Sequence, residues 1–489
     1  MIKNYRSILF TIAVTVLFAG LTNAQDRLYP TARFNALGRT KWAFVDSLVQ
    51  LGAFRLNQNP AGFIADTKTL SNMLRFVPQF YSENGDLRRR LDAEAQWTSE
   101  NNVEQLIALG SDKVFFGSAN FNYEKRARVA NAVQLFPYHA GPFYITDDTV
   151  SGAKLQQPEI YAIYSFSLSE QISFGIEGGY RLIDALRFIG SSARTIDRHL
   201  NVCAGVMYQM NTVYIGTLFE IEDGQEKIDA RGVDVFNISL RKFRGNRFST
   251  VAIGSTLNSL TKRRAYRWGA EAIYKSENSM IEGGIVANLR RRNFSIGVPS
   301  SGLVDIEDTF TNQEQLSASG IVRRQTPTNN LTAMVSFERA NTWGSLSRRN
   351  LLLAEWTLNE VYATISGAQA ITATNTLFGI ELIVGTRSMD SSLYIDNQFT
   401  QRQALWTRVS AGIEQKTFQT LLLRLGIGFS KNGIDVVTGV DNVEQLEFTG
   451  GFGLLFKKTL IEVAVSNHVR RTAQLKRNGL MATLQVTFY

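Results

Sequence analysis

In the last ten residues, Leu480 to Tyr489, every second side chain from Leu480 to Phe488 is apolar, and the face between them carries Met481 and three polar side chains, Thr483, Gln485 and Thr487. Successive side chains of a β-strand point to opposite faces, so this pattern predicts a strand with one apolar face. An apolar edge strand invites aggregation unless it is paired, and a closed membrane barrel leaves no edge because its last strand pairs with its first. The end of the chain therefore predicts an outer-membrane β-barrel.

The same period of two recurs along the chain in pairs of segments joined by short polar turns. These pairs are 160–168 with 172–180, 200–208 with 213–221, 266–274 with 281–289, 405–413 with 421–429, and 446–456 with 461–465. Earlier candidate strands lie at 73–77, 90–97 and 113–123. Hairpin units of roughly 45 residues predict an all-β, transmembrane, antiparallel up-and-down barrel of about 18 strands. The number should be even and between about 14 and 20, because 241–258 and 361–375 are ambiguous.

Longer polar stretches separate the hairpins, and we expect them to be loops. They are Glu222–Gly232, Arg290–Asp308, Arg387–Gln401 and Lys431–Asn442. Short turns alternating with long loops are typical of outer-membrane barrels, with the short turns in the periplasm. The segment Arg126–Pro158 has no clear period, which indicates an extracellular loop or an inward-folded constriction.

The N-terminus has the composition of a secretory signal peptide. Lys3 and Arg6 precede an apolar run, Ile8–Phe18, and small residues lead up to a cleavage site after Ala24. We therefore expect a signal peptide at 1–24, an N-terminal segment at 25–70 and a transmembrane barrel at 71–489. Export and the lack of a later apolar run long enough for a spanning helix favour the cell outer membrane.

Charge and cysteine content exclude two other classes. The net charge of +9 falls to about +7 when the charges of Lys3 and Arg6 are removed, but no basic helix or nucleic-acid motif accompanies it. We expect no nucleic-acid partner. The single cysteine, Cys203, excludes an internal disulfide framework.

The N-terminal segment contains the motif Asn59-Pro60-Ala61-Gly62. The chain resembles long-chain fatty acid transporter (FadL-like) barrels and related barrels of the Bacteroidetes type. The resemblance lies in this motif, in the signal peptide of the chain and in its alternating strands. The resemblance implies that the segment tucks into the barrel as a luminal hatch. The alternative is an ordinary turn, because Asn-Pro commonly initiates turns.

Charged residues recur on the polar faces of the expected strands. A charge on the lipid face costs about 2–4 kcal/mol at the membrane midplane, so we assign these residues to the lumen. The candidates are Glu177, Arg181, Glu220, Arg267, Glu271, Glu282, Glu355, Glu381, Arg408, Glu414, Arg424, Glu447 and Glu462. Such a wall either forms structural ion pairs or lines a selective path for a solute.

Catalytic and metal-binding motifs are not found in the sequence. It contains three histidines and no zinc-protease motif, cysteine cluster or Gly-x-Ser-x-Gly elbow, so we expect no enzyme, metal or cofactor. A barrel hydrolase would need a serine and a histidine on the outer wall. His199, beside Asp197, is the one candidate for that role.

Four basic clusters fall beside the expected strands on the long-loop side: 262–264, 290–292, 348–349 and 470–471. Arginine pairs readily with phosphate, so these clusters indicate lipopolysaccharide as a partner, or simply solvated loop charge. The barrel-assembly machinery is a second expected partner. However, Tyr489 is one step out of phase with the apolar face, unlike the usual terminal signature.

These features predict a passive transport channel for small or hydrophobic solutes. The alternative is a non-transporting barrel that anchors or scaffolds an envelope or secretion complex.

Overall fold

The computed structural model describes residues 59–67 and 72–488, with gaps at 90, 133, 136–142, 188–190, 233–238, 245–248, 254–255, 277–280, 299–305, 327, 348–350, 418–419, 435–440 and 457–458. The expected signal peptide, its cleavage site, residues 25–58 and Tyr489 lie outside this description. The helices within it are short: η4 (Pro60–Gly62), α2 (Phe63–Thr67), η5 (Thr372–Thr374) and η6 (Tyr394–Asp396). None of these described helices has the length and apolarity needed to cross a membrane.

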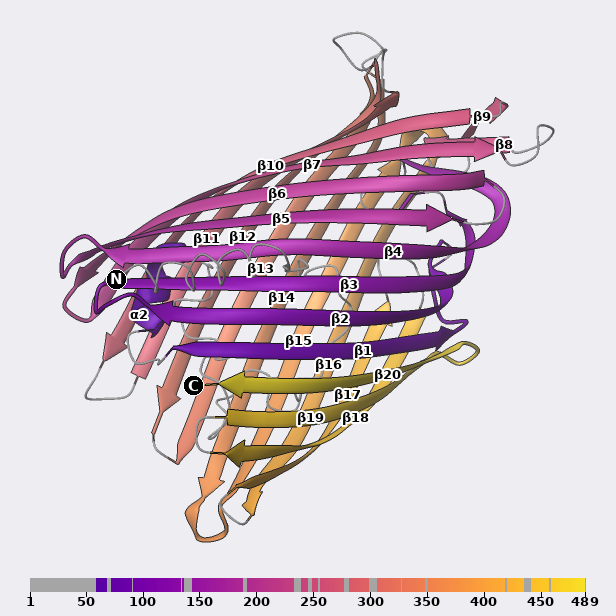
Figure 1. Cartoon of the computed structure of the whole chain (residues 1–489). Coiled ribbons are helices and arrows are strands. Elements are labelled where there is room, and N and C mark those ends of the chain that lie inside the picture. Colours follow the sequence, from indigo (N-terminus) through magenta and orange to yellow (C-terminus); the bar gives the residue numbers. More distant parts are fainter. Residues whose placement is uncertain are drawn as a thin grey trace, which may run out of the picture.

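The strands form one antiparallel sheet (Figure 1). They are β1 (Met73–Gly85), β2 (Ala93–Ala108), β3 (Lys113–Ala132), β4 (Phe143–Ser167), β5 (Ile172–Arg187), β6 (Ser191–Met210), β7 (Val213–Gly232), β8 (Ser239–Arg244), β9 (Ser249–Ile253), β10 (Thr256–Ser276), β11 (Ile281–Val298), β12 (Ile306–Gln325), β13 (Asn329–Leu346), β14 (Leu351–Ile371), β15 (Thr376–Leu393), β16 (Gln398–Thr417), β17 (Leu421–Ile434), β18 (Asp441–Phe456), β19 (Thr459–Arg471) and β20 (Lys476–Phe488).

The sheet closes into a barrel. Each strand pairs with the next, except that β7 pairs with β10 and the hairpin β8–β9 branches off the wall. The last strand pairs with both β19 and β1, from Leu74 opposite Phe488 to Gly85 opposite Arg477. The wall therefore has 18 strands. Both the strand number and the closure through the C-terminal strand are confirmed.

The outer face carries an apolar band. Along β10, the outward side chains from Tyr266 to Tyr274 are apolar, and Trp268 is 52% exposed. This length matches the roughly 9–11 residues that a tilted strand needs to cross a membrane. The intervening side chains, including Arg267 and Glu271, face the interior. Closure, an apolar exterior and a polar interior together are the arrangement of an outer-membrane barrel.

The two ends of the barrel differ. At the terminal end, where β1 begins and β20 finishes, strands join through tight turns such as Asn211-Thr212. Asn211 has a φ of 55°, a left-handed conformation that asparagine tolerates in two-residue hairpins. At the distal end β7 and β10 are separated by the hairpin β8–β9, which lies at the far right of Figure 1.

The expected loops are wrong in one consistent way, because the strands continue beyond the apolar band. Most of Glu222–Gly232, Arg290–Asp308 and Arg387–Gln401 is strand, and β17 and β18 extend into Lys431–Asn442. Arg126–Pro158 contains the end of β3 and the start of β4. The basic clusters 262–264 and 290–292 also lie within strands, while 348–349 falls outside the described residues. Backbone pairing needs no apolar side chains, so polar composition marks the limit of the membrane and not the end of a strand.

Candidate functional site

The inner wall brings most of the expected charged residues into ion pairs between strands. Glu220 on β7 accepts a bond from Arg267 on β10 at 2.6 Å. Arg408 lies 3.6 Å from Glu447, and Arg323 lies 3.8 Å from Glu282. Such pairing links strands that are adjacent or one strand apart, and it balances acids and bases that face the same interior.

Arg424 is the centre of the most buried of these groups. Its guanidinium donates to Glu414 at 2.6 Å and also pairs with Glu462. The Arg424 side chain is 2% exposed. Gln485 extends the group through a hydrogen bond to Glu462 at 2.7 Å. Removing one partner would leave a buried charge uncompensated, which typically costs about 3–5 kcal/mol, so the members of this group between β16 and β20 depend on one another.

The remaining expected residues also lie on the inner face, with one exception. Glu177, Glu271 and Glu381 are buried and Arg181 is partly buried. Glu355 is exposed and accepts a hydrogen bond from the Tyr394 hydroxyl at 3.1 Å, so its assignment to the lumen is wrong. It lies near the distal end of β14, beyond the apolar band, where an outward charge meets water.

His199 does not lie where a barrel hydrolase needs it. Its side chain is on the inner face of β6, and Nε2 lies 3.8 Å from Glu222. Asp197 is fully buried and pairs with Arg263 across the wall. The placement of His199 on an outer-wall catalytic site is therefore wrong. Among the described residues, no group of three or more histidine, cysteine, aspartate or glutamate side chains has the geometry to hold a metal ion.

The motif Asn59-Pro60-Ala61-Gly62 lies against the inner wall near the terminal end, where its residues form the short helix η4. The Asn59 side chain caps this helix by accepting a hydrogen bond from the Ala61 amide at 3.0 Å. Pro60 occupies the first helical position, where its missing donor and fixed φ are tolerated. We call Asn59–Thr67, which contains η4 and α2, the docked segment.

Hydrogen bonds to four neighbouring strands, β5, β6, β7 and β10, hold the docked segment. The Asn59 amide donates to the Glu271 carboxylate on β10 at 2.6 Å and to the backbone carbonyls of Val206 and Thr217 at 3.4 Å. Ser173 donates to the Ala61 carbonyl at 3.1 Å. The Asn59 side-chain oxygen therefore accepts a hydrogen bond within the docked segment, and its nitrogen donates to the wall.

Glycines in the wall make room for these contacts. A Cβ on Gly175 would overlap the backbone of Pro60, and a Cβ on Gly205 would overlap the Asn59 side chain. A Cβ on Gly216 would come within 2.8 Å of the Asn59 amide nitrogen. These three glycines, on β5, β6 and β7, form a niche with the shape of the motif. Sequence reasoning found the motif but missed the niche, whose one signal was glycine at inward positions.

Apolar contacts also hold the docked segment against the wall. Ala61 packs in a cluster with Met207 of β6 and Ile273 of β10. Phe63 joins a second cluster and meets the ring of Phe116 edge-on, with centroids 6.0 Å apart. A cavity of about 20 Å³, room for about one water molecule, lies beside the segment and is lined in part by Ile64.

The distal end contains a second inward contact. The first residues of β4, Phe143–Val150, run past the wall and pair with β8 from Phe143 opposite Arg244 to Thr146 opposite Arg241. We call Phe143–Val150 the mouth segment. The ring of Phe143 packs with Ile296 and Leu353 on the opposite side of the barrel. A Cβ on Gly344 would come within 2.5 Å of that ring.

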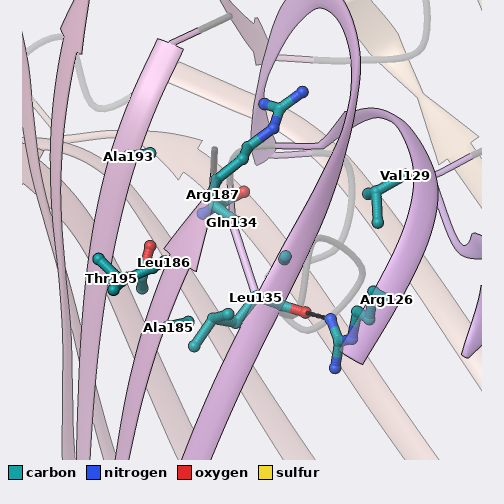
Figure 2. Close-up of a pocket in the computed structure, with 10 residues that line it drawn as sticks. Arg126, Val129, Gln134, Leu135, Ala185, Leu186, Arg187, Ala193 and Thr195 are labelled. Carbon is teal, nitrogen blue, oxygen red and sulfur yellow. Dashed lines mark hydrogen bonds between the residues drawn. The ribbon is translucent and has the colours of Figure 1, made fainter. Parts of the chain in front are cut away.

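The residues just before the mouth segment also turn inward. The Leu135 amide donates to the Glu226 carboxylate at 3.1 Å, and the Ile145 amide donates to the Gln134 side chain at 3.0 Å. Figure 2 shows Arg126 directed at the Leu135 carbonyl, at 3.0 Å, beside a cavity of about 30 Å³. Part of the expected segment 126–158 is therefore an inward-folded constriction.

Solved structures resemble this chain at low sequence identity. The ferric preacinetobactin receptor BauA from Acinetobacter baumannii is 9% identical, with 86% of this chain and 80% of that chain covered and a TM-score of 0.46. The toluene transporter TodX from Pseudomonas putida is 10% identical, with 88% and 91% covered and a TM-score of 0.33. No curated protein matches the chain. A family model described as a family of unknown function (DUF6850) matches residues 65–438, and the chain belongs to that family.

Proposed function

We propose that this protein is an outer-membrane transport barrel for small or hydrophobic solutes, and that the docked segment is a hatch at the terminal end of its lumen. The observation that carries the proposal is the niche formed by Gly175, Gly205 and Gly216 around the motif. Glycine within a strand costs roughly 0.5–1 kcal/mol relative to alanine. A barrel that only anchors other proteins gains nothing from three such positions.

The bonding of the docked segment also suits a removable element. It is not a strand of the wall, and η4 reaches the wall through side-chain hydrogen bonds and a few small apolar contacts. Its resemblance to the motif of long-chain fatty acid transporter barrels supports the same interpretation. Charged side chains on the inner wall are paired between strands, so their role in solute selection is secondary to wall stability in this proposal.

The test is a change of permeability when the niche is filled. In Gly175→Ala the added methyl group would overlap the backbone of Pro60. The docked segment can avoid this overlap only by moving away from the wall. We expect several-fold higher conductance in planar bilayers and faster liposome swelling with small neutral solutes. Gly428→Ala is the matched control, because its Cβ faces inward on β17 and meets only ordinary contacts at 3.7 Å and beyond.

One outcome would replace the proposal. If the folded Gly175→Ala barrel and a barrel lacking residues 25–67 both remain sealed, the transport function is rejected. A partner protein that co-purifies in detergent with such a sealed barrel would instead support the scaffold alternative.

A further inference from the structure

Successive side chains of β10 and β11 point to opposite faces of the wall. The basic clusters 262–264 and 290–292 are therefore divided between the inner and the outer face. Arg263 and Arg290 face inward, where they pair with Asp197 and Glu222. Lys262, Arg264 and Arg291 face outward and are exposed. Each cluster in the sequence thus supplies both inward arginines in ion pairs and outward cations on the outer wall.

The outward cations belong to β6, β10 and β11, which with β7 form four adjacent strands of the wall. In the cross-strand register Arg198 of β6 lies opposite Gln225 of β7, and Gln225 lies opposite Lys262 of β10. Two rows nearer the membrane, Arg291 of β11 lies opposite Tyr266. We call Arg198, Lys262, Arg264 and Arg291 the basic patch. Neighbouring strands are about 4.8 Å apart, so the patch is compact enough to meet one ligand.

The basic patch borders the apolar band directly. Below it on the same outward face lie Leu200, Ile221, Trp268 and Leu289, each at least 42% exposed. The patch lies toward the distal end of the barrel, away from the short turns. It is therefore at the level where lipid phosphates of the outer leaflet meet the acyl chains.

Two acidic side chains lie beside the four cations of the basic patch. Asp223 pairs with Arg264 at 3.2 Å, and the exposed Glu314 lies opposite Arg291 in the register. Within the described residues, no ion pair involves Arg198 or Arg291. The same level of β15 and β16 carries neutral outward side chains, including Thr386 and Gln403. Exposed cations also occur on β17 and β19, where Lys431 and Arg471 both pair with Glu444. Four cations beside two carboxylates leave the basic patch with a net positive charge.

We propose that the basic patch is a binding site for a phosphorylated glycolipid of the outer leaflet, of the lipopolysaccharide type. Arginine and lysine pair with the phosphates through charge-assisted hydrogen bonds, and the acyl chains lie on the apolar side chains below. Several phosphates on one headgroup fit several cations in one sector better than the single phosphate of a common phospholipid does. The site is on the outer wall and is independent of the proposed transport function.

The test uses the full-length barrel in detergent and native mass spectrometry with purified bisphosphorylated lipid A. We expect the triple variant Arg198→Gln/Lys262→Gln/Arg291→Gln to bind it at least about tenfold more weakly than the unmodified protein. The control Lys431→Gln/Arg471→Gln/Lys476→Gln removes the same charge from the exposed rim of β17, β19 and β20 and should retain binding. Gel electrophoresis of unheated samples in detergent checks that each variant forms a barrel, because a folded barrel resists the detergent and migrates as a separate band.

Comparison of ligands distinguishes a glycolipid site from general attraction of anionic lipid. Dephosphorylated lipid A and phosphatidylglycerol should both bind at least about tenfold more weakly than bisphosphorylated lipid A. The proposal is overturned if the two triple variants lose binding equally. It is also overturned if phosphatidylglycerol binds as tightly as bisphosphorylated lipid A, or if the unmodified barrel binds neither lipid.

Discussion

The two ends of the lumen use glycine in the same way but hold their contents differently. At the terminal end, Gly175 and its neighbours admit a helical segment bound by the polar side chain of Asn59. At the distal end, Gly344 admits the ring of Phe143, which belongs to a strand continuous with the wall. Polar bonds can be exchanged for bonds to water. Each end also buries an aromatic ring, but Phe63 of the docked segment is not on a paired strand, whereas withdrawal of Phe143 would break strand pairing as well as packing.

The terminal end is the one better able to open. The docked segment leaves no gap in the sheet when it departs, because it contributes no strand to the ladder. The mouth segment would have to break its pairing with β8 as well as its apolar contacts. We therefore expect the terminal end to open and the distal constriction to stay in place.

The largest effect is expected from Phe143→Ala. Removing a buried phenylalanine typically costs about 3–5 kcal/mol, and here the loss should act locally on the mouth segment. Amide hydrogen exchange of residues 143–150 should accelerate by at least about a hundredfold, with no change at 59–67. Acceleration at both sites would show that the two ends of the lumen open as one cooperative unit and are not held independently.

A smaller effect is expected from Asn59→Asp, which replaces the donor facing Glu271 by a second carboxylate. Loss of a hydrogen bond to a charged group costs about 1.5–3 kcal/mol, so exchange at residues 59–67 should accelerate while the mouth segment is unchanged.

The double variant Asn59→Asp/Glu271→Gln tests the cause of that effect. It restores a donor and an acceptor across the same 2.6 Å contact, so protection of the docked segment should recover in large part. If Asn59→Asp has no effect, or if the second substitution gives no recovery, the bond to Glu271 does not hold the segment.

The smallest effect is expected from Gly344→Ala. Its added methyl group meets the edge of the Phe143 ring at 2.5 Å, and overpacking of this kind costs about 1–3 kcal/mol. We expect the lower part of that range, because a ring edge can tilt where the backbone of Pro60 cannot. Urea unfolding followed by tryptophan fluorescence gives the change. A loss larger than that of Phe143→Ala would reverse the expected order.

Much of the fold was predictable from the sequence because the membrane imposes a period of two on every wall strand. The closing strand, Leu480–Phe488, and the turn at Asn211-Thr212 lie where their residue types indicated. Strand lengths were not predictable from the same signal. Beyond the apolar band both faces are polar, so a residue such as Arg291 looks like loop even though its backbone is paired.

The site was predictable only in part, since it depends on register between strands that are distant in sequence. The motif at Asn59 is visible locally, but the meeting of Gly175, Gly205 and Gly216 requires the sheet to be known. Glu355 shows the limit of assignment by charge. The rule that keeps charges off lipid applies only within the band, and Glu355 lies outside it.

The length of the wall strands also fixes the height of the distal mouth. A strand such as β7 has 20 residues, which at about 3.3 Å each and a tilt of about 45° rise by roughly 45 Å. An apolar band is about 25 Å tall, so the wall projects some 20 Å past the lipid. Phe143 and its partners consequently lie above the membrane surface. A water-soluble molecule that approaches the distal end therefore meets the constriction without entering the bilayer. A lipid-borne molecule reaches the constriction only after it leaves the membrane.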